Sequence, residues 1–423
     1  MIGLGVLLAV AVTVDKPDHL YSCNEEIVFT AKASAADSGK TYPWTIAGDG
    51  GLSITGTWEV ASGDLVRKVS LAKPGFVLMS VRTLAEKGKP FKFARAGAGV
   101  EPEKIRPGAE KPDDFDAYWA DQIAKMRALP VKAVVREAPE YLDAKQTAEF
   151  GGKVKVYDVR LEDGVYNATG ILTVPADATP GSCGALCTFG GASWTGAFTN
   201  PRAALDYHAM VFHMNLHDSK NKLTSEENRE VHRRVKGYQY DNLDDREKYY
   251  PRKIFLRIVR SLDYVKSRPE WNRRELAARG PSMGGCQTIV AAALDKDVTV
   301  CAPGAPAMCD HTGYRADHIC GYPDVLSHYR GDPEKFAKAE RNSAYFDVVN
   351  FARNVKCEAC FGVGFVDVTC PPTSVYAAFN SMPSERKTIH NAVLSGHDDG
   401  AFKGDRQGRI RDHLKGNQGG RGK

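Results

Sequence analysis

The 423-residue sequence lacks the features that mark several broad classes of protein. Beyond its first residues, no segment approaches the roughly 20 consecutive apolar residues that a membrane-spanning helix needs. No block of basic residues stands out, and the formal net charge of +5 is spread along the chain, whereas nucleic-acid binders concentrate basic residues in one domain or stripe. No internal repeat is present. We therefore expect no membrane and no nucleic acid among the partners.

The ten cysteines form no recognisable redox or metal pattern. Cys357 and Cys360 make a C-x-x-C pair, but they lie in a strand-like run, whereas redox pairs of this spacing sit at a helix N-terminus. Residues 309–320 contain two cysteines and two histidines, at spacings that fit no common zinc site. A chain of this length can also fold without disulfides or metals. We expect neither a metal nor any other cofactor.

The first residues form an apolar stretch with two interpretations. Residues 1–11 have the length of a signal peptide and end in Ala9-Val10-Ala11, although no positive charge precedes the apolar run. Alternatively, residues 10–14 are the first strand of a β-domain. We favour export, which predicts a secreted or periplasmic protein, with a cytoplasmic protein as the alternative.

Residues 1–95 have the pattern of an all-β domain. Short runs rich in Val, Ile, Phe and Thr alternate with Gly, Asp, Pro and Ser clusters, at 27–30, 52–55, 65–71 and 76–81. This even spacing predicts a small Ig-like β-sandwich. Trp44 and Trp58 are expected to fill its core rather than bind sugar. We expect an accessory domain that supplies no catalytic residue.

Residues 96–145 are expected to form a linker and a leading helix. The stretch 101–112 is rich in proline and charge, as linkers are. Asp113 can then cap a helix, because apolar side chains follow it at helical spacing. These are Phe115, Trp119, Ile123 and Met126.

Residues 146–415 alternate apolar strand-like runs with amphipathic helices, the pattern of a mostly parallel sheet covered on both faces. The expected strands are 153–160, 169–174, 185–189, 209–213, 276–280, 298–302, 359–364 and 388–394. The predicted fold class is therefore α/β, with a mostly parallel sheet covered by helices and preceded by a β-sandwich. Residues 416–423 are expected to be a flexible tail.

The most informative motif is Gly280-Pro281-Ser282-Met283-Gly284, which matches the G-x-S-x-G nucleophile elbow. A serine on a tight strand-to-helix turn needs neighbours without side chains, so that strand and helix can approach closely. We therefore predict an α/β-hydrolase fold for this part of the chain, with Ser282 as the nucleophile. The backbone N–H of Met283, at the start of the helix, is one expected oxyanion-hole donor.

An acid and a base should follow the serine in the order Ser, Asp, His. Asp367 comes after the strand-like run 360–364, and His397 comes after 389–394. Both therefore sit at carboxyl ends of expected strands, where the sites of open α/β sheets gather. We predict His397 as the general base and Asp367 as the carboxylate that orients it. The rival acids are Asp347, Asp398 and Asp399.

The second oxyanion donor is expected in the loop after the strand-like run 186–189. That loop reads Gly190-Gly191-Ala192-Ser193-Trp194. Because glycine lets a backbone N–H approach a ligand closely, Gly191 is the candidate. Trp194 is either a wall of the acyl or sugar pocket or part of the core.

Several segments resemble the acetyl xylan esterase / cephalosporin C deacetylase family. They are 345–352, 363–380 with its Asp-x-x-Cys-Pro-Pro run, the elbow 280–285 and the helix 113–119. The resemblance covers roughly residues 100 to 415 and implies a triad of elbow serine, the aspartate before Cys-Pro-Pro and a late histidine. These positions fall on Ser282, Asp367 and His397. The resemblance also implies that acetate is released from O-acetylated sugars such as acetylated xylo-oligosaccharides.

Three positions depart from the family pattern. Met283 stands where the family usually has glutamine, which matters little if only its backbone amide is used. The family's His-Gly-Tyr appears here as residues 189–191, and its Arg-Gly-Gln-Gly is replaced around residues 215–219. The last two departures bear on the range of substrates rather than on the type of reaction.

Two alternative functions remain open from the sequence. One is a broad-range carboxylesterase or a serine peptidase, because the fold alone does not set the substrate. The other is a non-catalytic carbohydrate-binding protein, in which Trp44, Trp58 and Trp194 would stack on sugar rings. The expected partner is an acetylated carbohydrate, and a homo-oligomer is compatible with the sequence.

Overall fold

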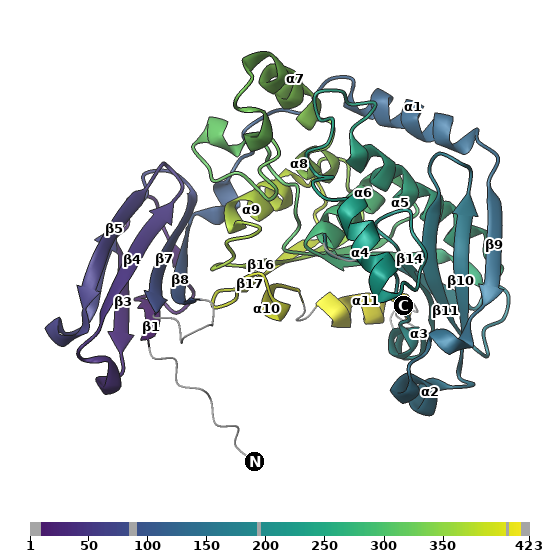
Figure 1. Cartoon of the computed structure of the whole chain (residues 1–423), viewed down its shortest axis with the longest axis horizontal. Coiled ribbons are helices and arrows are strands. Elements are labelled where there is room, and N and C mark those ends of the chain that lie inside the picture. Colours follow the sequence, from purple (N-terminus) through teal and green to yellow (C-terminus); the bar gives the residue numbers. More distant parts are fainter. Residues whose placement is uncertain (1–9, 84–90, 193–195, 403–405, 416–423) are drawn as a thin grey trace, which may run out of the picture.

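The computed structural model describes residues 10–83, 91–192, 196–402 and 406–415 (Figure 1). The apolar residues 1–9, Trp194 and the expected tail 416–423 lie outside these ranges. Two parts lie side by side: a β-domain near the N-terminus and a larger α/β part that contains the rest of the chain.

The β-domain consists of two sheets that share one core. The three-stranded sheet has the order β1 (Val10–Val14), β3 (Ile27–Ala33), β6 (Leu65–Val69). The five-stranded sheet has the order β2 (Leu20–Tyr21), β8 (Lys92–Val100), β7 (Gly75–Thr83), β4 (Thr41–Gly48), β5 (Ser53–Glu59). Trp44 and Trp58 are buried in the shared core, as expected. The last strand ends at Val100, beyond the expected boundary at residue 95.

The α/β part is built on one nine-stranded sheet. Its strand order is β17 (Lys387–Ala392), β16 (Glu358–Gly364), β15 (Val300–Gly304), β14 (Trp271–Pro281), β12 (Cys183–Phe189), β13 (Ala209–Met214), β11 (Ala168–Pro175), β10 (Val154–Glu162), β9 (Lys132–Glu137). The strands from β13 to β17 pair in parallel, and β9, β10 and β11 add an antiparallel edge. All eight strands expected for this part are present.

Strand β9 was not predicted, because it lies inside the segment expected to be linker and leading helix. All six of its residues are exposed, so the sequence carries no alternation of buried and exposed positions there. A strand at the edge of a sheet can form by backbone pairing alone, and β9 pairs with β10 over residues 132–137. The α/β part therefore begins before the expected boundary at residue 146.

Helices cover both faces of the nine-stranded sheet. One face packs against α1 (Phe115–Arg127), α5 (Tyr250–Ser267), α6 (Met283–Leu294), α8 (Val348–Ala352) and α9 (Pro372–Ser381). The other face packs against α2 (Ala144–Phe150), α3 (Pro201–Tyr207) and α11 (Arg406–Leu414). The neighbouring residues Leu186 and Cys187 of β12 face opposite sides of the sheet, since their side chains belong to the two different cores. Three further helices are α4 (Ser225–Arg234), α7 (Pro333–Ser343) and α10 (Asp399–Phe402).

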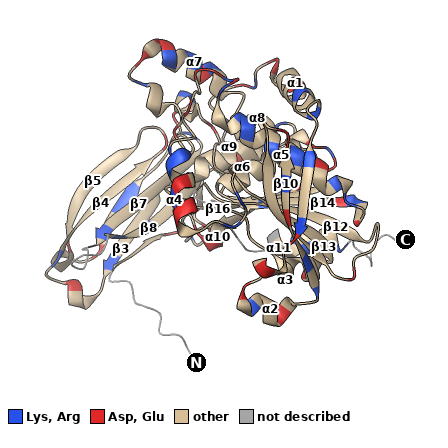
Figure 2. Ribbon diagram, turned by 45° about the vertical axis from the view of Figure 1, so that its right-hand side comes forward, with Lys and Arg blue, Asp and Glu red and all other residues tan. Residues whose placement is uncertain are grey.

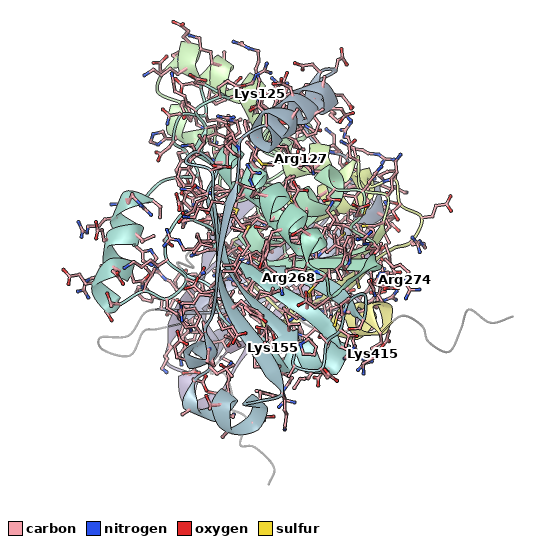
Figure 3. All side chains as sticks on the ribbon, turned by 90° about the vertical axis from the view of Figure 1, so that its right-hand side faces the viewer. Lys125, Arg127, Lys155, Arg268, Arg274 and Lys415 are labelled. Atoms are coloured by element: carbon pink, nitrogen blue, oxygen red, sulfur yellow. The ribbon has the colours of Figure 1, made fainter. Side chains whose placement is uncertain are left out.

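Basic and acidic residues are interspersed along the ribbon (Figure 2). On α4 acidic residues occupy the first turn and basic residues the last turn, which suits the helix dipole. Figure 3 labels six basic residues on the side of the sheet that carries β9. Four of them form ion pairs with carboxylates: Lys125 with Asp121, Arg127 with Asp263, Arg268 with Glu270 and Arg274 with Glu275.

Within the described ranges, we find no helix that combines the length and apolar character required to cross a bilayer.

Candidate active site

Ser282 occupies the sharp turn between β14 and α6. Its backbone has φ 56° and ψ −121°, a conformation that a residue with a side chain adopts only under strain. The Ser282 N–H donates to Gly304 O at 2.8 Å, and the Ala307 N–H donates to Ser282 O at 3.0 Å. These bonds hold the strained turn against the segment that follows β15. The turn presents a serine at the carboxyl edge of the parallel strands.

The glycines around Ser282 allow the chain to pass closer than a side chain would permit. A Cβ atom on Gly284 would lie 2.3 Å from Phe189 O, and one on Gly280 would lie 2.7 Å from the same oxygen. A Cβ on Gly285 would lie 2.8 Å from the Cα of Pro306. The G-x-S-x-G pattern thus has the role expected from the sequence: it brings α6 against the ends of β12 and β15.

We expect Gly284→Ala to destabilise the protein and to lower its esterase activity. The new methyl group would meet the backbone oxygen of Phe189, which cannot move without shifting β12, and overpacking of this kind costs about 1–3 kcal/mol. Gly331→Ala is the matched control, because a Cβ there meets nothing within 4 Å. Thermal unfolding and initial rates on a small acetyl ester measure both effects. Equal behaviour of the two variants would contradict the close-approach argument.

His397 and Asp367 form a direct hydrogen bond, in which His397 Nδ1 and Asp367 Oδ2 are 2.8 Å apart. The Asp367 side chain is fully buried, and its Oδ1 accepts from the N–H groups of Thr369 at 2.8 Å and Cys370 at 2.9 Å. The His397 side chain retains 22% exposure. Its ring packs edge-on against Phe402 at 4.9 Å. The carboxylate is therefore fixed on both oxygens, and the imidazole lies between it and solvent.

The acid and base loops meet because of a glycine at the end of β16. A Cβ on Gly364 would lie 2.4 Å from Ser395 O and 2.5 Å from Gly396 O. The Val366 N–H also donates to Ser395 O at 3.2 Å. Parallel strands β16 and β17 thus bring two loops that are 30 residues apart in sequence into contact.

Cys370 connects the acid to the nucleophile. Its backbone N–H donates to Asp367, and its thiol lies close enough to the Ser282 side chain for the two to interact. Burial raises the pKa of the Cys370 thiol, and the negative charge of Asp367 raises it further, so the thiol stays protonated at neutral pH. Cys370 therefore lies between the segment that carries the acid and the turn that carries the serine. The sequence contained Cys370 only as part of a motif and gave no sign of this contact.

The rival acids have other structural roles. Asp347 caps α8 and accepts from the backbone N–H groups of Asp310 and His311. Asp398 accepts from the N–H groups of Gly396 and Gly400, within the loop that carries His397. Asp399 begins α10. The geometry therefore favours Asp367 over all three.

The two expected oxyanion donors lie in segments that one side chain ties together. Met283 is the first residue of α6, and the first N–H groups of a helix have no partner within the helix. Gly191 lies two residues beyond the end of β12. Gln287 Nε2 donates to both Gly190 O at 3.2 Å and Met283 O at 3.1 Å. Sequence reasoning missed Gln287, although its position one turn after Met283 places it on the same side of α6.

Neither the cysteines nor the histidines suggest a second type of chemistry. All ten cysteines lie in the described part of the chain, and none of them forms a disulfide. Burial lowers the pKa of His213 and of His217 to about 3, so both imidazoles are neutral at ordinary pH. Across residues 10–415, leaving aside the undescribed gaps, no three His, Cys, Asp or Glu side chains are grouped so that they could hold a metal ion.

Comparison with known proteins gives consistent matches. The family model described as acetyl xylan esterase (AXE1) matches residues 101–412, beginning directly after β8. Acetyl esterase Axe7A of Xylanibacter ruminicola is 30% identical over 328 residues, which cover 76% of this chain and 70% of that protein.

Two solved structures share the fold. The acetyl xylan esterase from Paenibacillus sp. R4 aligns with a TM-score of 0.62 and 22% identity, over 74% of this chain and 98% of that one. Acetyl xylan esterase 1 from Thermoanaerobacterium sp. JW/SL YS485 aligns with a TM-score of 0.58 and 23% identity, over 74% and 96% respectively. Both likenesses confirm the predicted α/β architecture.

Proposed function

Because the chain belongs to the acetyl xylan esterase family, we propose that Ser282, His397 and Asp367 release acetate from O-acetylated sugars by acyl transfer. The family identifies the protein as a serine carboxylic-ester hydrolase acting on carbohydrate esters. The observations that support the residue assignment are the 2.8 Å hydrogen bond between His397 and a buried Asp367 and the strained backbone of Ser282. Structural strain of this kind is concentrated at functional sites.

The first half of the reaction forms an acyl-enzyme. The Ser282 oxygen attacks the acetyl carbonyl carbon while His397 Nε2 takes the hydroxyl proton. His397 Nδ1–H donates to Asp367, whose negative charge stabilises the imidazolium that forms. The carbon–oxygen bond to the sugar then breaks, and His397 returns the proton to the departing sugar hydroxyl.

The carbonyl oxygen carries negative charge in the tetrahedral intermediate. In our proposal, the N–H groups of Gly191 and Met283 donate hydrogen bonds to this oxyanion. Donors fixed in advance cost no reorganisation during the reaction, and the loss of one such donor typically costs about 100- to 1,000-fold in rate. Gln287 supports both segments, since it holds the carbonyl groups of Gly190 and Met283.

The second half of the reaction frees acetate. Water attacks the acyl carbon while His397 takes one proton from it, and the proton then returns to Ser282 as acetate leaves.

Acetate release from acetylated xylo-oligosaccharides, compared with other acetylated glycans, tests the proposed substrate. We expect the xylo-oligosaccharides to be among the good substrates. A fluorophosphonate probe should label Ser282, and failure to label would support the carbohydrate-binding alternative. A p-nitrophenyl ester series from acetate to longer chains separates an acetyl esterase from a broad-range esterase, because broad activity on long chains would contradict the acetyl assignment.

Location outside the cytoplasm is a separate proposal, which rests on the apolar residues 1–11. Cleavage after Ala11 would remove Val10, a buried core residue of β1, whereas retention would leave the strand whole. N-terminal sequencing of the protein recovered from cell fractions decides between these outcomes. A full-length protein confined to the cytoplasm would contradict export.

A further inference from the structure

The β-domain lies beside the α/β part (Figure 1). It packs directly against the loop that carries Asp367. A Cβ on Gly97 of β8 would lie 2.1 Å from Phe365 O, two residues before the acid. The ring of Phe76 on β7 packs edge-on against Phe365, with centroids 5.0 Å apart, and also contacts Tyr376 of α9 at 5.6 Å. Phe76 belongs to the core of the α/β part rather than to that of its own domain.

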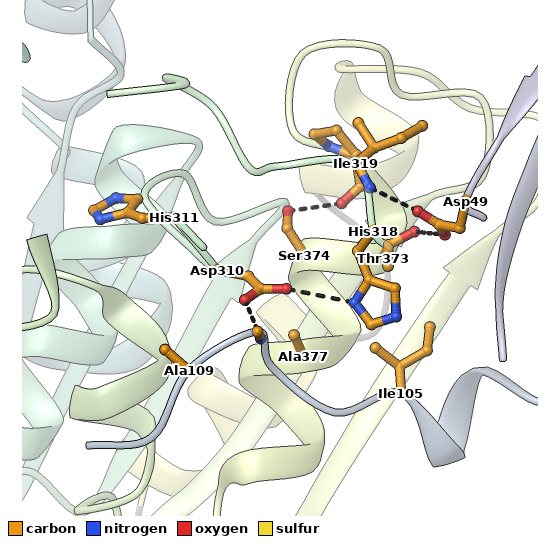
Figure 4. A network of polar contacts seen from close by, with 12 residues as sticks. Asp49, Ile105, Ala109, Asp310, His311, His318, Ile319, Thr373, Ser374 and Ala377 are labelled. Carbon is orange, nitrogen blue, oxygen red and sulfur yellow. Dashed lines mark hydrogen bonds and ion pairs between the residues drawn. The ribbon is translucent and has the colours of Figure 1, made fainter. Parts of the chain in front are cut away.

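One carboxylate lies at the centre of this contact. Asp49 follows β4, is 3% exposed, and accepts three hydrogen bonds. Figure 4 shows the bonds from Ile319 and Thr373. Asp49 Oδ1 accepts from the Ile319 N–H at 2.7 Å. Its Oδ2 accepts from the Thr373 hydroxyl at 2.5 Å and from the Phe76 N–H at 2.7 Å. Burial raises the pKa of the Asp49 carboxyl, and the hydrogen bonds from Thr373, Ile319 and Phe76 oppose that rise.

Two of these three donors belong to segments that hold the active site. Thr373 is on α9, three residues after Cys370, whose N–H donates to Asp367 and whose thiol contacts Ser282. Ile319 belongs to the segment after β15, near whose start Ala307 donates its N–H to Ser282 O. Asp49 thus joins a segment attached to the acid with a segment attached to the nucleophile.

Neighbouring contacts fix the same segment. The Gly50 N–H donates to Asp317 O at 2.7 Å, and Lys73 forms an ion pair with the Asp317 carboxylate at 2.9 Å. The His318 ring lies 3.6 Å from the Asp310 carboxylate, as Figure 4 shows. Burial lowers the pKa of His318, but the contact with Asp310 and the charge of Asp49 outweigh burial and raise it.

We propose that Asp49 is a positioning residue for the catalytic triad, so that the β-domain is a structural part of the active site. The inference rests on the proposed function of Ser282, His397 and Asp367. It differs from the expectation of an accessory domain, because Asp49 contacts both of the segments that must keep their relative positions during the reaction.

Three donors, two N–H groups and one hydroxyl, converge on the Asp49 carboxylate. An asparagine at position 49 would turn an NH₂ group toward one of the N–H or O–H donors, and a buried donor without an acceptor is unfavourable. The segments would move apart to relieve this contact. A displacement of about 1 Å at a catalytic group can cost about 100-fold in rate even when it originates far from the chemistry.

The test uses matched variants of the full chain. We expect Asp49→Asn and Thr373→Val to lower kcat on a small acetyl ester about 10- to 100-fold per active site, with KM little changed. Active sites are counted by fluorophosphonate titration, which corrects for any unfolded fraction. Thr373→Ser keeps the hydroxyl and should restore kcat. Asp37→Asn is the control within the β-domain, because Asp37 is equally buried but its carboxylate bonds to Ser34 and Lys40 of the same domain.

Each possible result of these measurements either supports or contradicts the positioning role of Asp49. If kcat per titrated site stays at the wild-type value in Asp49→Asn and Thr373→Val, Asp49 affects folding alone and the proposal is wrong. An equal loss in Asp37→Asn would also overturn it. If Asp49→Asn does not fold, the comparison of Thr373→Val with Thr373→Ser decides alone. Absence of activity in the unmodified protein would instead contradict the proposed function.

Discussion

Replacement of Ser282 by alanine is expected to abolish acetyl-ester hydrolysis while the fold remains. The variant lacks the oxygen that forms the acyl-enzyme, and the loss of a triad nucleophile lowers kcat by about 10⁴-fold or more. The hydroxyl is small and its backbone is held by Gly304 and Ala307, so the surrounding structure should not change. Initial rates on acetylated xylo-oligosaccharides, with circular dichroism as a check on folding, measure the effect.

Two controls accompany this variant. Fluorophosphonate labelling should disappear together with activity, because both depend on the same oxygen. Cys370→Ala tests the neighbouring thiol, which contacts Ser282 but is kept protonated by burial. Residual activity of more than a few per cent in Ser282→Ala would show that another group is the nucleophile.

Asp367→Asn is expected to lower kcat by about 10⁴-fold, as the same change does in other triads. The structure gives the reason. Oδ1 accepts from the Thr369 and Cys370 N–H groups, so the amide oxygen of an asparagine would take that position. Its NH₂ group would then face His397 Nδ1 and hold the proton of the imidazole on Nε2. Nε2 could no longer accept the Ser282 proton.

Asp398→Asn is the matched control for the acid. Asp398 lies next to His397 in sequence, but its carboxylate accepts from Gly396 and Gly400 within its own loop. We expect a much smaller loss of kcat than in Asp367→Asn. Equal losses in the two variants would mean that the acid has been assigned incorrectly.

The fold class was predictable because buried parallel strands leave continuous apolar runs in the sequence. Each of the eight expected strands of the α/β part is present, whereas β9, which is exposed along its whole length, left no such run. The triad candidates were predictable for a different reason. Ser282, Asp367 and His397 each follow a strand, and chain order alone places all three at one edge of a parallel sheet.

Contacts between distant segments that no motif relates to each other could not be predicted. Asp49 and Thr373 are 324 residues apart, and neither lies in a motif that points to the other. The contacts of Cys370 with Ser282, and of Gln287 with Gly190, depend on loop paths that no periodic pattern encodes. The proline-rich stretch after β8 indicated a linker, and therefore a separable β-domain. The surfaces through which the β-domain contacts the α/β part cannot be recognised in the sequence.

The backbone of Ser282 has a consequence for how this protein can be made more heat-resistant. Its φ of 56° is one that glycine adopts freely, while a residue with a side chain pays about 1–3 kcal/mol for it. That amount is a large fraction of the stability of an ordinary domain. A library selected only for a higher melting temperature would therefore tend to retain variants with glycine at position 282. Selection for thermal stability must be combined with selection for catalytic activity, since at this residue the two requirements are opposed.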